Sequence, residues 1–220
     1  MTRGGDELAP GERSHRYGKG AGAVGGRRAE AQLRYAWMNA RWVLDDLDDE
    51  EYLWEPTPVC WSVRRRGPEV HGWGRGEFVC EDAWPPPEPL PVTTIAWRVI
   101  HLAAWTDIYR HWTFGDERPT LRDADVPGNA SEGVSWLCDA QDRFMHAVDA
   151  LDDRSVFALR PAHWGESLPV VQLVMSMLTE HVHHIAEIGV LRDLRRGCAL
   201  TRPRFYEPDT TAGEADAEPR

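Results

Sequence analysis

Two long apolar segments of this chain each carry side chains that could bind a metal ion. In the segment from Leu173 to Leu191, Glu180 and His184 share a helical stripe with large hydrophobic residues, because spacings of three and four bring residues to one face of a helix. His101 has the same setting, among the tryptophans and aliphatic residues of another segment. A carboxylate or imidazole on a core face needs a partner, since its burial alone is costly. The simplest explanation is a mononuclear metal site between two helices.

The spacing of Glu180 and His184 suits a shared ion. Residues four apart in a helix have Cβ atoms about 5–6 Å from each other, so both side chains can reach one metal. With His101 from a second helix as the third ligand, positions for water or substrate stay open, as in catalytic zinc sites. We therefore expect a divalent metal, with zinc as the first candidate and nickel, iron or manganese as alternatives. The sequence lacks HExxH and gives no support to metalloprotease chemistry.

Neighbouring residues leave alternatives open at this site. His181 also lies beside apolar residues and could replace Glu180 as a ligand, whereas His183 lies on a more polar face and is expected to be exposed. Glu187 could be a ligand, an acceptor for the N–H of a ligating imidazole, or a solvated charge. Without a metal, a Glu–His hydrogen bond could form inside the helical core. His101 would then bond to a tryptophan N–H or a backbone carbonyl.

Four amphipathic stretches must position these residues. They are expected at about Ala29–Leu47, from Thr93 or Thr94 to Phe114, from near Ser131 to Leu151, and from about Ser167 to Arg196. No convincing strand alternation lies between them, which predicts an all-α four-helix bundle. The connection between the first two helices, from Tyr52 to Pro91, is unusually long and can hold a short hairpin in which CWSVRR pairs with GEFVCE. We expect this connection to pack Trp54, Trp61 and Trp84 over one end of the bundle.

Composition divides the 220 residues into one domain and two tails. Residues 1–27 and 207–220 are predicted to be disordered, because they have too few large hydrophobic residues to form a core, which leaves 28–206 as the domain. A formal charge of −11 without a basic patch argues against nucleic acid as a partner. No apolar run is long enough for a membrane span and no signal segment is visible. We expect a cytoplasmic protein that acts on a small-molecule substrate.

Three segments of the chain resemble the DinB/YfiT-like superfamily: LWEPTPVCWSVRRR, PVTTIAWRVIHLAAW and EHVHHIAEIGVLRDLRR. The resemblance covers roughly residues 29–197 and is closest to the branch that includes the mycothiol-dependent maleylpyruvate isomerases. It implies a DinB-like four-helix bundle with a long crossover and a divalent metal held by one His of the second helix and two ligands of the fourth. By this resemblance His101 takes the second-helix position. Glu180 and His184 take the fourth-helix positions, where many members have two histidines.

The same resemblance implies chemistry on a small molecule, since the family's activities include transfer or isomerisation with a low-molecular-weight thiol such as mycothiol or bacillithiol. We therefore expect a metal-dependent enzyme, in which the ion lowers the pKa of a thiol cofactor as it does that of metal-bound water. A metal-dependent hydrolase, with water in place of the thiol, is one alternative. A non-catalytic bundle that binds a ligand or another subunit, for example as a homodimer, is the other.

Overall fold

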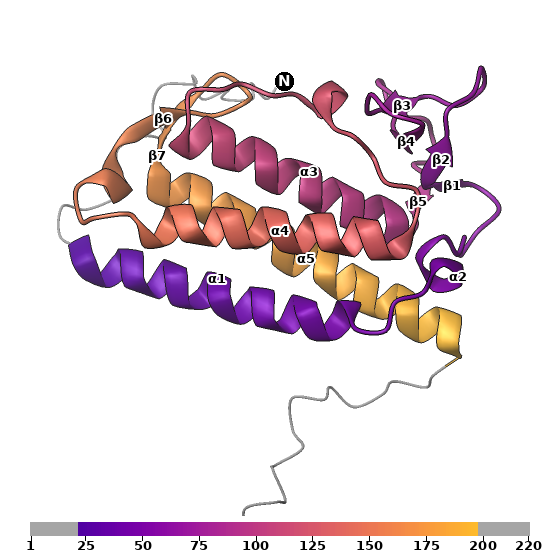
Figure 1. The fold of residues 1–220 in the computed structure, drawn as a ribbon, viewed down its shortest axis with the longest axis horizontal. Helices are drawn as coiled ribbons and strands as arrows, with labels where there is room; N and C mark the ends of the chain where they lie inside the picture. The colour runs from indigo at the N-terminus through magenta and orange to yellow at the C-terminus, as the bar shows by residue number, and fades with distance from the viewer. Residues whose placement is uncertain (1–21, 198–220) are drawn as a thin grey trace, which may run out of the picture.

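The computed structural model describes residues 22–197, with side chains from Glu30 onward. Four long helices lie side by side in this range: α1 (Gly22–Leu44), α3 (Ile95–Phe114), α4 (Ala130–Asp149) and α5 (Val170–Arg196). α1 and α5 run in one direction and α3 and α4 in the other, so the connection 115–129 crosses the length of the bundle (Figure 1). The short helix α2 (Asp49–Tyr52) lies at the end where α3 and α4 begin. The predicted tail 207–220 and most of the predicted tail 1–27 lie outside the described residues.

Short strands accompany both ends of the bundle. The long connection before α3 contains β1 (Cys60–Trp61), β2 (Val63–Arg65), β3 (Gly72–Trp73), β4 (Phe78–Glu81) and β5 (Val92–Thr93). β2, β4 and β3 form an antiparallel sheet, in that order, while β1 pairs in parallel with β5. At the opposite end, β6 (Leu159–Pro161) and β7 (Ser167–Pro169) form a hairpin between α4 and α5 (Figure 1).

The prediction of an all-α four-helix bundle is therefore wrong. Residues 22–197 form five α-helices and seven strands in three small sheets, which is a mixed α and β architecture. The hairpin between CWSVRR and GEFVCE is confirmed, because β2 and β4 pair antiparallel. The other strands escape prediction since each has only two or three residues, too few for an alternation of apolar and polar positions to show. Pairs such as β1 and β5 also join segments far apart in the sequence.

Two helix starts are set by capping residues. The Thr94 side chain accepts a hydrogen bond from the N–H of Trp97 at 3.2 Å and begins α3, as predicted. α4 begins at Ala130, next to the predicted Ser131, and its capping residue is Asn129. The Asn129 side chain accepts from the N–H of Glu132 at 2.9 Å, and the Glu132 carboxylate accepts in return from the Asn129 amide. The first of these bonds satisfies a backbone N–H that the first turn of a helix leaves unbonded, and the second holds the Asn129 side chain in place.

α5 is the longest helix, and it carries two of the three predicted ligands. It begins at Val170, because the predicted first turn, Ser167–Pro169, pairs with β6 instead. It ends before Gly197, whose φ of 64° is the left-handed conformation that glycine adopts without a steric penalty. Since the helix spans the whole bundle, its two ends contact different elements. One end contacts β7 of the β6–β7 hairpin, and the other contacts α2.

The core lies between the four long helices and extends under the long connection. Leu33, Ile100, Leu137 and Ile188 are fully buried and come from one helix each. The connection covers one end of this core with tryptophans, as expected, but the set of tryptophans differs from the predicted one. Trp73 is buried and Trp54 packs against the core, whereas Trp84 is 93% exposed.

Candidate metal centre

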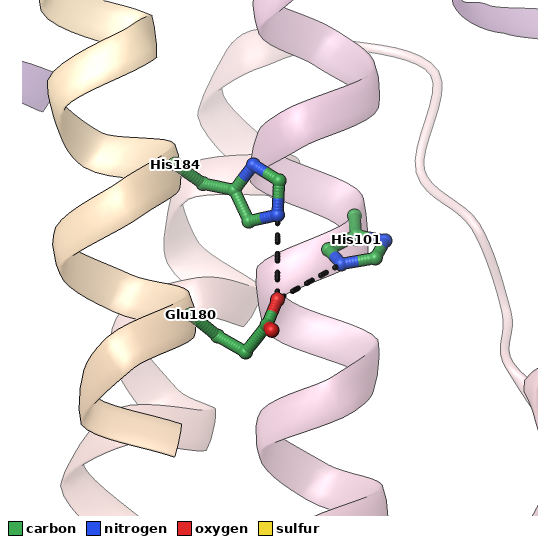
Figure 2. Close-up of side chains that lie close together, drawn as sticks. All are labelled: His101, Glu180 and His184. Atoms are coloured by element: carbon green, nitrogen blue, oxygen red, sulfur yellow. Dashed lines mark ion pairs between the residues drawn. The ribbon is translucent and has the colours of Figure 1, made fainter. Parts of the chain in front are cut away.

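α3 and α5 bring the three predicted ligands together (Figure 2). The Oε2 atom of Glu180 lies 3.7 Å from Nε2 of His101 and 3.4 Å from Nε2 of His184. One ligand atom from each residue lies within 4.8 Å of the other two. An imidazole of α3 therefore meets the i,i+4 pair of α5 at the interface between the two helices.

The separations between these atoms are longer than most hydrogen bonds. Donor–acceptor distances for N–H···O bonds peak at about 2.9–3.0 Å. By contrast, two ligand atoms that each lie about 2.1 Å from one tetrahedral ion are about 3.4 Å apart. The observed 3.4 and 3.7 Å are compatible with the spacing of atoms that share an ion. Direct Glu–His hydrogen bonds fit these distances less well.

Burial and mutual contact set protonation states that suit ligation. Interaction with His101, and then with His184, holds the pKa of the Glu180 carboxyl well below its usual range, so this group is ionised at neutral pH. Burial lowers the pKa of His101 and favours its neutral imidazole. The Glu180 side chain is 40% exposed, against 18% for His101 and 11% for His184. The cluster is therefore most accessible to solvent on its carboxylate side.

A second carboxylate, that of Glu187, fixes the orientation of His184. The Oε2 atom of Glu187 lies 2.8 Å from Nδ1 of His184, which leaves Nε2 of this ring facing Glu180. Arg98 of α3 donates to the same Glu187 carboxylate. Of the three roles considered for Glu187, the structure favours that of acceptor for an imidazole N–H, the usual partner of a metal-bound histidine.

Arg98 is the polar residue of this cluster that the sequence interpretation missed. Its side chain is 12% exposed and lies against Glu187 and His184, with Nη1 at 3.2 Å from Nδ1 of the latter. Burial lowers the pKa of Arg98 to about 10, so the guanidinium stays charged at neutral pH. The available signal was its position three residues before His101, which places both on one face of α3.

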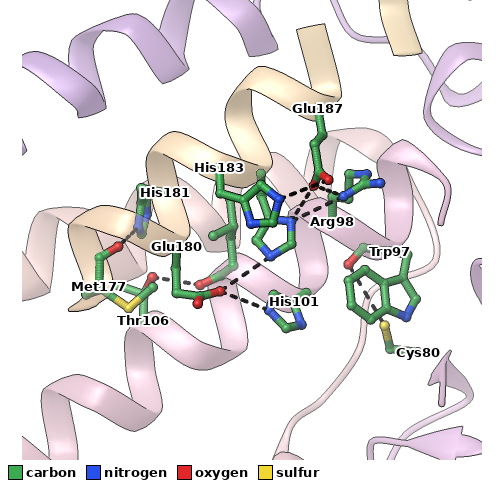
Figure 3. Close-up of polar contacts among 12 residues, drawn as sticks. Cys80, Trp97, Arg98, His101, Thr106, Met177, Glu180, His181, His183 and Glu187 are labelled. Carbon is green, nitrogen blue, oxygen red and sulfur yellow. Dashed lines mark hydrogen bonds and ion pairs between the residues drawn. The ribbon is translucent and has the colours of Figure 1, made fainter. Parts of the chain in front are cut away.

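His181, the alternative ligand, points away from the cluster (Figure 3). Its ring is 1% exposed, with Nδ1 3.0 Å from the carbonyl oxygen of Met177, and it meets Trp37 of α1 edge-on. Burial lowers the pKa of His181 to about 4, which keeps it neutral. The α5 side chain that meets His101 is therefore that of Glu180. His181 instead packs where α5 contacts α1.

His183, His184 and Glu187 form a second group of candidate ligand atoms within 4.8 Å of one another. The side chain of His183 is 63% exposed, as expected, and its Nε2 lies 3.2 Å from Oε1 of Glu187. However, the guanidinium of Arg98 already pairs with this carboxylate, and a metal ion would have to compete with that positive charge. The group of His101, Glu180 and His184 is the better candidate.

Aromatic rings flank the cluster along α3. The Trp97 ring stacks on His101 with centroids 4.6 Å apart and an interplanar angle of 19°. The Trp105 ring lies 6.2 Å from His101. Both tryptophans lie four residues from His101, one on each side in the sequence, which places all three on one stripe. The helical periodicity predicted this stripe. It could not distinguish tryptophans that pack in the core from tryptophans that lie beside the site.

Comparison with known proteins identifies the family. The DinB superfamily model matches residues 32–188, which is more than half of the chain, and the chain belongs to the DinB superfamily. The structure is similar to that of a DinB-like protein from Bacillus cereus ATCC 10987, with a TM-score of 0.54, 15% sequence identity, and coverage of 78% of this chain and 92% of that one. At this identity the likeness concerns the fold alone. A search of the curated proteins finds no match.

These comparisons confirm the resemblance to the DinB superfamily that the three sequence segments indicate. They do not extend to the mycothiol-dependent branch, which stays a prediction. Among residues 22–197, none of the helices combines the length and the apolar character that crossing a membrane requires.

Proposed function

We propose that His101, Glu180 and His184 bind one divalent metal ion and that this site acts on a small molecule. The observation that carries the proposal is the position of Glu180 Oε2, 3.7 and 3.4 Å from the Nε2 atoms of two histidines on different helices. Two imidazoles and one carboxylate are a donor set found in catalytic zinc sites, with a fourth position left for water or substrate. Zinc is the first candidate, and nickel, iron and manganese accept the same donors.

The residues around the ligands support this role. Glu187 accepts from Nδ1 of His184 and thereby fixes the ring tautomer, so that the Nε2 lone pair is directed at the site. Arg98 compensates the charge of Glu187 inside the bundle. The exposed part of Glu180 leaves the site open to a ligand from solvent. A divalent ion held here would lower the pKa of a bound thiol or water towards neutrality.

Within this proposal, transfer or isomerisation that uses a mycothiol-type thiol is the preferred reaction. Its support is the resemblance of the three sequence segments to the thiol-dependent branch of the family. The open carboxylate side of the site, next to Glu180, is where a thiol from solvent would arrive. Hydrolysis would use water at the same place and requires no additional residue.

Elemental analysis of the purified protein, followed by a screen for consumption of electrophiles, tests the proposal. A single divalent ion per chain is expected, lost in His184→Ala and retained in His183→Ala, whose imidazole is exposed. Turnover that needs both the metal and an added thiol would support the thiol reaction, and turnover without thiol would identify a hydrolase. Stoichiometric metal without turnover would indicate a binding protein. Full metal content in His184→Ala would overturn the site.

A further inference from the structure

The metal site is continuous with a second cluster of aromatic side chains. His101, Trp105 and Tyr109 follow one another at intervals of four residues on α3, so they share one face and span about 12 Å at 1.5 Å per residue. His163 and Trp164 lie in the turn between β6 and β7 and pack onto this face. Trp105, Tyr109, His163 and Trp164 are called the aromatic wall below.

The rings of the aromatic wall are in mutual contact and reach from a proposed ligand to solvent. The Trp105 centroid lies 6.2 Å from that of His101 and 4.4 Å from that of His163. Trp164 follows at 4.7 Å from His163 and is 45% exposed. Tyr109 lies 5.4 Å from His163 and 6.3 Å from Trp164. The series begins at His101 and ends at an exposed indole.

Two polar groups of the aromatic wall make ring contacts only. Among the described residues, neither the hydroxyl of Tyr109 nor a ring nitrogen of His163 has a hydrogen-bond partner. Burial raises the pKa of Tyr109 to about 12, so its hydroxyl is a donor at neutral pH. A donor and an imidazole nitrogen are thus available beside the rings and close to the metal site.

Anchoring of the hairpin does not require the aromatic wall. The hairpin region already has apolar anchors in Ala162, at 2% exposure, and Val156, at 6%, while Leu168 packs against the main core. An anchor would also be expected to bury its rings fully, yet Trp164 remains about half exposed. Tyr109 is itself buried at 8% exposure and the Trp164 N–H donates to Glu166, so the aromatic surface that packing leaves over is chiefly that of the Trp164 ring.

We infer that the aromatic wall binds a flat aromatic ring of the substrate, whose acidic head group reaches the metal. The inference rests on the proposed metal site and names the class of molecule that it would take: a small aromatic acid or a close analogue. Stacked and edge-on aromatic pairs are favoured at centroid distances of about 4.5–7 Å, and the ring pairs of the wall lie at 4.4–6.4 Å. Tyr109 and His163 would then hydrogen bond to polar substituents of the ring.

Hydroxamates test this inference because they bind metal ions through one head group and vary only in the attached group. Benzohydroxamate, cyclohexanecarbohydroxamate and acetohydroxamate are titrated into the zinc-loaded full-length protein. Benzohydroxamate should bind about tenfold more tightly than acetohydroxamate and more tightly than the cyclohexane compound, which is as large but not flat. The advantage should fall to about threefold or less in Trp105→Leu and in Trp164→Leu. Trp84→Leu, which removes an indole that is 93% exposed, should keep it.

Acetohydroxamate serves as the internal control for folding. A wall variant that binds it with wild-type affinity has an intact metal site, and Trp105→Phe provides a milder change if Trp105→Leu does not fold. An intact site with equal affinities for benzohydroxamate and acetohydroxamate, or a ring advantage that survives in both leucine variants, would overturn the aromatic wall and leave the metal site standing. If elemental analysis finds no bound ion and no hydroxamate binds, the proposed function fails and this inference fails with it.

Discussion

α5 takes part in two clusters of ionisable residues that differ in how tightly their charges are paired. Near its C-terminal end, Arg192 meets Glu51 of α2 with an Nη2–Oε2 distance of 2.9 Å, and both side chains are buried. Arg192 also donates to the carbonyl oxygens of Val43 and Asp45, where α1 ends. The cation thus satisfies carbonyl groups that a helix end leaves without partners.

The cluster in the middle of α5 is built differently. Its central carboxylate, Glu180, is partly exposed, and the nearest imidazole nitrogens are 3.4 and 3.7 Å away. Glu51 is paired at 2.9 Å with Arg192 and at 2.8 Å with Arg196, so both of its carboxylate oxygens already face a cation of α5. Longer contacts around an accessible carboxylate leave space for an ion and a path to it. The comparison separates a structural cluster from a candidate functional one within a single helix.

Removal of Glu51 should have the largest effect. In Glu51→Ala the buried guanidinium of Arg192 loses its carboxylate, and breaking a buried pair in this way costs about 3–5 kcal/mol. Urea unfolding of the metal-free protein measures the loss. Glu50→Ala is the matched control, because the Glu50 side chain is 86% exposed and lies 3.7 Å from Arg195. It should change the free energy of unfolding by less than about 1 kcal/mol. Equal losses in the two variants would contradict the structural role of the Glu51 cluster.

Opposite behaviour is expected for the neighbours Glu180 and His181. Glu180→Gln should weaken zinc binding by about 100-fold or more, or about 2.7 kcal/mol, and change the stability of the metal-free protein by about 1 kcal/mol or less. His181→Ala should retain zinc affinity and lose about 2–4 kcal/mol of stability, because it empties a buried site beside Trp37. Calorimetric zinc titration and urea unfolding in chelator separate the two effects. Loss of zinc in His181→Ala together with full binding in Glu180→Gln would reverse the ligand assignment.

A smaller effect should follow from the change Glu187→Gln. The amide replaces a charged acceptor of the His184 Nδ1–H by a neutral one, and changes of this kind typically cost about 10–100-fold in metal affinity. The stoichiometry at saturating zinc should remain unchanged. His183→Ala, which removes the exposed partner of the same carboxylate, should alter the affinity by about twofold or less. Wild-type affinity in Glu187→Gln would show that the carboxylate does not act through His184.

The sequence was sufficient to single out the three candidate ligands because each departs from its surroundings. His101, Glu180 and His184 are polar residues on apolar stripes, and a stripe maintained over some twenty residues gives the helix and its buried face together. The long helices were predictable for the same reason. Their approximate boundaries followed from caps such as Thr94 and Gly197, whose local chemistry is visible in the sequence.

The remainder depends on contacts between distant segments. Periodicity places Glu180 and His181 at the two edges of the same buried face of α5, and only the positions of α3 and α1 decide which one meets His101. The role of Arg98 likewise depends on Glu187 lying opposite it across the helix interface. The short strands are paired by tertiary contacts, and the hairpin that carries His163 and Trp164 has no periodic signal of its own. For this reason the aromatic wall could not be predicted.

The smallest effect concerns the bundle end where α2 lies. α4 begins there, with its first N–H, that of Ala130, donating to Oδ1 of Asp49 at 2.7 Å and the N–H of Glu132 donating to the Asn129 side chain. Asn129→Ala removes the cap and should cost about 1 kcal/mol in the free energy of unfolding.

Ser131→Ala, at the start that the sequence suggested, should cost less than about 0.5 kcal/mol, because this residue is exposed and lies inside the first turn. Neither variant should change zinc affinity, since none of the three proposed ligands lies on α4. A larger loss in Ser131→Ala than in Asn129→Ala, measured by urea unfolding, would contradict the assignment of Asn129 as the capping residue. A change in zinc affinity in either variant would show that the bundle end and the metal site are coupled, and would remove the distinction between the two clusters of α5.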